Sequence, residues 1–280
     1  MRGAAWTGSQ FIAVGDSGTI LTSTDAVSWT TRTSGTLENL YGITSSSTQI
    51  VAVGAGSTIL TSPTGTGWPP RTSHGGSILH GVIWSGTQFL IVGDYPNVQT
   101  SFDGVTWTRQ NQAIANSTYS AAWSGTEFVT VGELGTYQIS PDGIGLATDF
   151  NTSIGTDLNG VVWFHNRFIA VGLNGIIYTT PGSSGLRDSL FGIATSGSRV
   201  AAVGALGTII TSPDGISWTT RASNVTVHLY GIAGSGTQFV AVGDLGTIAT
   251  SSDLVTWTTQ TSGTSNRLRG YNVLPACFRR

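Results

Sequence analysis

The side chains that could do chemistry recur at two positions of a repeating pattern in this 280-residue chain. The first position directly follows the start of each repeat and holds an aromatic ring, a histidine, an asparagine or an arginine. The second lies in a glycine-flanked turn and holds a carboxylate in several repeats. Aromatic rings beside amide and carboxylate groups are typical of sites that bind sugars or other small ligands. We therefore expect a ligand site, with the candidate residues Tyr41, His80, Tyr119, Asn159, Phe191, Tyr230, Arg269, Asp94, Glu133 and Asp244.

A period of about 39 residues places these side chains. Copies start at residues 1, 40, 79, 118, 158, 190 and 229, and a fragment of an eighth starts at 268. A repeat of about 40 residues that carries four short strands is the signature of a β-propeller, in which each repeat forms one blade. The sequence therefore predicts an all-β fold, a seven-bladed β-propeller of four-stranded blades.

The seventh copy illustrates the four strands of one blade. We expect strands at 229–234, 239–242, 247–251 and 255–258, separated by glycine- or aspartate-containing turns. Glycine and alanine at the centre of the first strand suit the crowded axis, and Trp257 on the fourth strand can cover the outer gap between blades. The fifth copy is seven residues short, which predicts the loss of most of its outermost strand.

The unbroken repeat predicts one domain over 1–273, followed by a tail over 274–280. Both ends contain a copy of the first strand, around Arg2-Gly3 and around Arg269-Gly270, and a ring of seven blades has room for one. We favour the C-terminal copy, 268–273, in the innermost place, where it would close the ring. The N-terminal copy could take that place instead, or the spare strand could pair with another molecule; we expect a monomer.

A second pattern, Ser-x-Asp-Gly-x-x-Trp, marks the turn between the third and fourth strands, as in 101–107 and 212–218. It resembles the Asp-box of the BNR-repeat propellers, which include sialidases and photosystem II stability/assembly factor-like proteins. The usual Asp-box has one further residue between Asp and Gly. The resemblance implies structural carboxylates on the face opposite the ligand site, and the residues concerned are Asp25, Asp103, Asp142, Asp214 and Asp253.

Several functions fit such a ring. Sialidase chemistry needs a set of converging arginines, a Tyr/Glu nucleophile pair and an acid, and the sequence lacks that set. A metal-dependent hydrolase of the lactonase, esterase or glycosidase type remains the alternative, with a divalent metal such as calcium and with His80 and Glu133 as weak metal candidates. The aromatic rings could also simply plug the tunnel. We predict a non-catalytic binding or assembly module without a cofactor, and its ligand would be a carbohydrate or a protein.

Composition narrows the partners further. Only 9% of residues are charged, lysine is absent and the formal net charge is −2. Such a chain offers no basic stripe for phosphates, so we expect no nucleic-acid partner. No apolar stretch is long enough to span a bilayer, so we expect no membrane insertion. The single cysteine, Cys277, has no partner within the chain. We expect an extracellular or periplasmic protein, although no signal peptide is visible.

Overall fold

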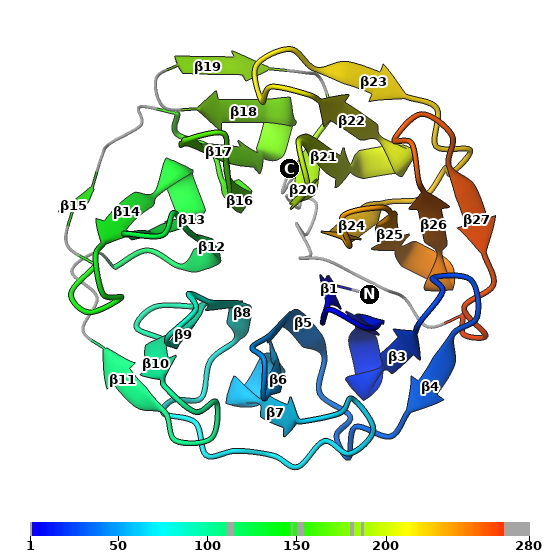
Figure 1. The fold of residues 1–280 in the computed structure, drawn as a ribbon. Helices are drawn as coiled ribbons and strands as arrows, with labels where there is room; N and C mark the ends of the chain where they lie inside the picture. Colours follow the sequence, from blue (N-terminus) through cyan, green and yellow to red (C-terminus); the bar gives the residue numbers. More distant parts are fainter. Residues whose placement is uncertain are drawn as a thin grey trace, which may run out of the picture.

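Seven antiparallel sheets stand around a central axis in the computed structural model, which describes residues 2–110, 115–146, 148–149, 154–179, 182–185 and 188–265. Each sheet is one blade, and strand order within the sheet follows the chain from the axis outward (Figure 1). The predicted seven-bladed β-propeller is thus confirmed. No helix within these residues is long and apolar enough to cross a membrane.

The strands of the seven blades have the following bounds. Blades one to three contain β1 (Gly3–Trp6), β2 (Phe11–Val14), β3 (Ile20–Ser23), β4 (Thr30–Arg32); β5 (Leu40–Ser45), β6 (Ile50–Gly54), β7 (Ile59–Ser62); and β8 (Leu79–Trp84), β9 (Phe89–Gly93), β10 (Val98–Ser101), β11 (Thr108–Gln110). Blades four and five contain β12 (Thr118–Trp123), β13 (Phe128–Gly132), β14 (Tyr137–Ser140), β15 (Thr148–Asp149); and β16 (Leu158–Phe164), β17 (Arg167–Gly172), β18 (Ile176–Thr179), β19 (Gly182–Gly185). Blades six and seven contain β20 (Leu190–Ser196), β21 (Arg199–Gly204), β22 (Ile209–Ser212), β23 (Thr219–Arg221); and β24 (Leu229–Gly234), β25 (Phe239–Gly243), β26 (Ile248–Ser251), β27 (Thr258–Gln260).

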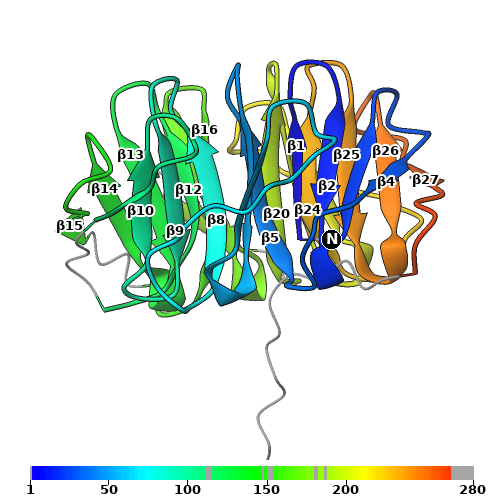
Figure 2. The same cartoon turned by 90° about the horizontal axis from the view of Figure 1, so that it is seen from below.

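Short 3-10 turns join the second and third strands in six blades. They are η1 (Asp16–Gly18), η2 (Ala55–Ser57), η3 (Glu133–Gly135), η4 (Leu173–Gly175), η5 (Ala205–Gly207) and η6 (Asp244–Gly246). Because neighbouring strands are antiparallel, these turns share one face of the ring with the first residues of the innermost strands. We call it the mouth face; the aspartate turns lie on the opposite face, as the strand directions in Figure 2 show.

Two blades differ from the sequence prediction at their outer edge. Blade two has three strands, and only a bridge between Leu60 and Pro70 stands in place of the fourth. Proline has no N–H to donate to a sheet, which explains the loss at Pro69-Pro70. Blade five keeps its fourth strand, β19, so the expected deletion was wrong. Thr179 pairs with Gly182, so the repeat is shortened in the connection and not in the strand.

The ring closes at its N-terminus. Strand β1 pairs with β2 in the innermost place of blade one, and it lies between β24 and β5 (Figure 1). Our preference for the C-terminal copy in that place was therefore wrong, and residues 268–273 lie outside the described part of the chain. A Cβ atom on Gly231 would lie 3.3 Å from the Arg2 carbonyl oxygen, so blades seven and one also meet closely at the axis.

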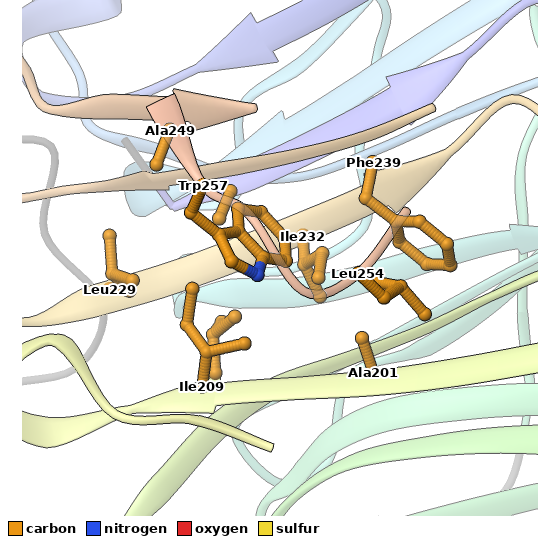
Figure 3. Close-up of a cluster of buried hydrophobic side chains, with 10 residues drawn as sticks. Ala201, Ile209, Leu229, Ile232, Phe239, Ala249, Leu254 and Trp257 are labelled. Atoms are coloured by element: carbon orange, nitrogen blue, oxygen red, sulfur yellow. The ribbon is translucent and has the colours of Figure 1, made fainter. Parts of the chain in front are cut away.

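Apolar layers between adjacent sheets form the core. Trp257 joins blades six and seven, because it packs on Ala201 and Ile209 of one blade and on Leu229 and Ala249 of the other (Figure 3). Phe11, Leu21 and Trp29 make the equivalent layer between blades one and seven with Val240 and Ile248. A blade alone would leave both faces exposed, so each layer needs its neighbour.

Glycine on the innermost strand lets neighbouring blades meet at the axis. A Cβ atom on Gly42 would lie 2.9 Å from the His80 carbonyl oxygen, and one on Gly192 would lie 2.6 Å from the Tyr230 carbonyl oxygen. Blade four has Ser120 at this position, and the Ser120 hydroxyl accepts a hydrogen bond from the Val161 amide of the next blade at 3.3 Å. The innermost strands are therefore too close for most side chains at this position.

The aspartate turns are held by hydrogen bonds within each turn. Asp214 Oδ1 accepts from the Ile216 and Ser217 amides at 2.8 Å and from the Ser212 hydroxyl at 2.9 Å. The same set of three bonds forms at Asp25, Asp103 and Asp253. Asp142 accepts from Ser140 and from the Ile144 amide. These bonds favour the charged carboxylate; backbone donors contribute most and lower the pKa of Asp25, Asp214 and Asp253 to about 2.

The first prediction concerns acid stability. A lowered carboxyl pKa contributes stability above the unfolded value of about 4, and that contribution is lost as the pH falls towards 2. The triple variant Asp25→Asn, Asp214→Asn, Asp253→Asn should therefore melt below the parent at pH 7, and the two melting temperatures should converge near pH 2. Thermal melts from pH 7 to pH 2 measure this. The exposed Glu38→Gln is the control, and a difference that stays constant with pH would contradict the prediction.

The second prediction concerns the axis. Gly42→Ala should lower the free energy of unfolding by about 1–3 kcal/mol, because the new methyl group meets backbone that cannot retreat. Gly76→Ala is the matched control, since no atom lies within 4 Å of its added Cβ. It should leave stability unchanged or raise it by up to about 1 kcal/mol. Urea unfolding measures both, and equal midpoints for the two variants would refute the crowding argument.

Candidate functional site

One side chain from the beginning of each innermost strand, or in blade one from the residue before it, meets its counterparts at the axis on the mouth face. Together they line a cavity of about 100 Å³, which we call the mouth cavity; its lining residues are Arg2, Tyr41, His80, Tyr119, Asn159, Phe191 and Tyr230. The same side chains border a space of about 170 Å³ along the innermost strands. The repeat places them together, because each is the second residue of its copy.

Nine of the ten predicted ligand-site residues lie in the described part of the chain; Arg269 lies outside it. Six of them line the mouth cavity, and Arg2 completes the ring in the position for which we had favoured Arg269. Asp94, Glu133 and Asp244 do not line it. They stand behind it in the turns that follow the second strands.

Arg2 is the cation of the mouth cavity. Its Nε donates to Asp16 Oδ1 at 2.7 Å, and its guanidinium carbon lies 3.9 Å from the centre of the Tyr41 ring. The Arg2 side chain is 9% exposed. Burial lowers the pKa of the guanidinium, and the neighbouring Tyr41 and Asp16 oppose that effect. An arginine stays protonated in such surroundings, so a fixed positive charge lies at the axis.

Carboxylates in the turns hold three of the seven cavity side chains. Besides Arg2 with Asp16, His80 Nε2 lies 2.7 Å from Asp94 Oδ1, and the Tyr230 hydroxyl donates to Asp244 Oδ2 at 3.2 Å. The hydrogen bond with His80 lowers the pKa of Asp94. The two members of each pair belong to one blade and have the same separation along the chain in all three blades. The sequence analysis missed this pairing, although the constant spacing between a donor and a carboxylate was a signal that could have revealed it.

The rings of the cavity contact one another: His80 meets Tyr41 and Tyr119 edge to face, and Phe191 is tilted against Tyr230. The His80 ring lies 5.8 Å from that of Tyr41 and 5.1 Å from that of Tyr119, and the Phe191 and Tyr230 rings are 5.3 Å apart. Asn159 Nδ2 donates to the Leu190 carbonyl oxygen at 2.8 Å. These contacts fix the rings in place but leave a space between them. The sequence analysis had allowed for rings that fill the tunnel completely; the structure has a cavity there.

The candidate metal ligands do not gather into one cluster in the described residues. No group of three or more histidine, cysteine, aspartate or glutamate side chains comes together in that part of the chain. His80 faces Asp94, whereas Glu133 accepts a hydrogen bond from the Ser117 amide at 3.3 Å. The two weak metal candidates, His80 and Glu133, therefore contact different partners.

Exposed apolar side chains stand around the mouth at the turns. Leu134, Leu206 and Leu245 are the central residues of η3, η5 and η6, and they are 63%, 68% and 65% exposed. Their φ angles are +54°, +51° and +55°, a left-handed conformation that costs about 1–2 kcal/mol for a leucine. The equivalent residues of η1 and η4 are Ser17 and Asn174. Leucine at this position is mostly exposed and does not favour the left-handed conformation.

Two larger hollows lie at the outer edge of the ring. They measure about 370 and 440 Å³ and are lined chiefly by glycine, serine and threonine of the turns and outer strands. Arg71 is the one ionisable side chain among their lining residues. Neither hollow gathers a set of chemically distinct groups comparable with the mouth cavity.

Comparison with known proteins agrees with the fold. No family model and no curated protein matches this sequence. Among solved structures, "YCF48 bound to D1 peptide" has a TM-score of 0.69 and 16% identity, covering 86% of this chain and 87% of that one. The WD40 β-propeller domain of Doa1 has a TM-score of 0.68 and 13% identity over 86% and 88%. The β-propeller domain of Cps50 (Swd1) from Myceliophteria thermophila has a TM-score of 0.68 and 12% identity over 86% and 93%. At such identities the similarity establishes a propeller fold, and the Asp-box family remains a prediction.

Proposed function

We propose that this protein is a non-catalytic module that binds a peptide segment of a protein partner on the mouth face. The segment places one of its side chains in the mouth cavity. The observation that carries the proposal is the convergence of seven side chains, one from each blade, on a single small space. Four of them are aromatic and one is a buried cation, a combination frequent in the anchoring pockets of protein interfaces.

The size of the mouth cavity favours a side chain over a whole sugar. Sites that bury a drug-sized ligand measure about 300–1,000 Å³. The mouth cavity measures about 100 Å³ and the space beside it about 170 Å³. One side chain of a peptide fits such a space, while the rest of the peptide would lie across the mouth face. A carbohydrate, the other ligand class that the sequence suggested, would have to bind outside the cavity.

The exposed leucines around the mouth support a protein partner. Solvent-facing leucines in a strained conformation lower stability, and such strain concentrates at functional positions. Leu206 and Leu245 belong to adjacent blades, and Leu134 lies on blade four. A peptide anchored at the axis would pass over these side chains and cover them. YCF48, a propeller of similar fold, has been solved bound to the D1 peptide, and that use of the fold supports the proposal.

The third prediction tests the site directly. Short linear peptides selected from a phage-displayed library against the parent protein should bind Phe191→Ala at least tenfold more weakly, because Phe191 lines the cavity and packs on Tyr230. Phe102→Ala is the matched control, since Phe102 is 79% exposed in an aspartate turn on the opposite face. Fluorescence anisotropy measures the affinities, and thermal melts verify folding.

Two outcomes would overturn the proposal. In one, the selected peptides bind Phe191→Ala and the parent equally well. In the other, the library yields no peptide while a glycan array yields a ligand whose binding depends on Phe191.

The fourth prediction concerns the leucines. The double variant Leu206→Asn, Leu245→Asn should be more stable than the parent, by up to about 1 kcal/mol per site, because asparagine adopts the left-handed conformation readily. The same variant should bind the selected peptides more weakly. Ile216→Asn, at a similarly exposed residue on the opposite face, should change neither property. Unfolding and anisotropy measure the two effects, and unchanged affinity in the double variant would remove the leucines from the binding surface.

A further inference from the structure

The guanidinium of Arg2 is only partly satisfied by the protein. An arginine has five N–H donors, and the Nε–H of Arg2 is directed to Asp16. Its four terminal N–H groups make no hydrogen bond within the described part of the chain, although the side chain is 9% exposed. A buried charge of this kind costs free energy unless other groups pair with it. Arg2 is one of the residues that line the mouth cavity.

Neighbouring side chains hold the Arg2 guanidinium in one orientation. Asp16 binds the Nε side, and the face of the guanidinium lies on the Tyr41 ring. The outer edge of the guanidinium, formed by its two terminal amino groups, is left for a ligand. That edge matches the two oxygens of a carboxylate, which arginine binds through two parallel hydrogen bonds. Lysine, a single point charge, would not offer this match.

The nearby acids do not fill that edge. Asp16 already contacts Nε, while Asp94 is engaged by His80 and Asp244 by Tyr230. Around the edge the cavity presents aromatic rings, which suit the methylene groups that carry a carboxylate. A volume of about 100 Å³ accommodates such a group and little more.

We propose that the mouth cavity is a carboxylate receptor in which the terminal amino groups of Arg2 bind the carboxylate of the partner peptide. This inference rests on the proposed peptide-binding function and specifies its anchor. The carboxylate could belong to an aspartate or glutamate side chain or to a chain end. Asp16 acts as a positioning residue, because it orients the guanidinium without touching the ligand.

The fifth prediction uses small carboxylates as probes. Titration of the 15N-labelled protein with sodium propionate should shift the Arg2 Nε–Hε signal in a saturable manner. Propionamide, which has the same shape without the charge, should not, and sodium chloride at equal ionic strength should not either. An unsaturated response to propionate, or an equal response to propionamide, would overturn the carboxylate receptor without requiring any variant.

Variants separate binding from structure. Arg2→Gln should weaken propionate binding at least tenfold, whereas Arg221→Gln should leave it unchanged; Arg221 also donates through Nε, but to Thr211 on an outer strand. Asp16→Asn keeps an acceptor for Nε and removes a competing negative charge, so it should tighten propionate binding. A purely structural role for the pair predicts no tightening, and weaker binding in Asp16→Asn would contradict our assignment.

The selected peptides then identify the source of the carboxylate. Replacing each acidic residue by its amide tests the side chains, and amidation of the C-terminus tests the chain end; one of the two should lower affinity at least tenfold. If neither does, and the peptides still require Phe191, the carboxylate inference fails while the proposed function stands. If propionate binds at Arg2 and no peptide is selected, the site takes free carboxylates and the peptide proposal fails.

Discussion

The close approach of the innermost strands is the constraint on which the rest of the structure depends. Seven strands meet around one axis, and at several of the glycines on them a carbonyl oxygen of the next blade lies 2.6–3.3 Å from where a Cβ would be. Gly3, Gly42, Gly192 and Gly231 accept this contact because they have no side chain. The residue before each glycine is thereby held at a fixed height on the mouth face. The seven side chains of the mouth cavity converge because the backbone beneath them cannot spread.

The different roles of the strands and turns within a blade follow from this geometry. The second strands and the tryptophan layers supply apolar burial between sheets, as Trp257 does between blades six and seven. The aspartate turns secure the opposite face with bonds confined to each turn. Residues at the mouth contribute little to either task, so they can differ from blade to blade. Arginine, tyrosine, histidine, asparagine and phenylalanine can share one ring without disturbing the fold.

The repeat allowed much of this structure to be predicted from the sequence. Its period determines the blade count, and it also brings equivalent residues together, so the candidates from Tyr41 to Tyr230 were identified without a structure. The repeat could not show which of two equivalent copies occupies a given place in the ring. Arg2-Gly3 and Arg269-Gly270 satisfy the same strand template, and only the pairing of β1 with β2 shows which copy occupies the axis. The fourth strands were also hard to predict, because proline removed one at Pro70 and a tighter connection preserved another at β19.

The positive charge of Arg2 at the mouth matters more because the rest of the chain has few charged residues. With 9% charged residues and no lysine, most of this surface exerts a weak field, so a single buried guanidinium is a strong local feature. A site of this type discriminates between partners chiefly through the free-energy cost of leaving the N–H groups of Arg2 without an acceptor. A peptide without a matching group would bury the edge of Arg2 with no acceptor, and the resulting cost of about one to several kcal/mol would reject it. Specificity at the mouth would then come from the terminal amino groups of Arg2, whose orientation Asp16 and Tyr41 hold. The exposed leucines around the mouth would add affinity that is less selective.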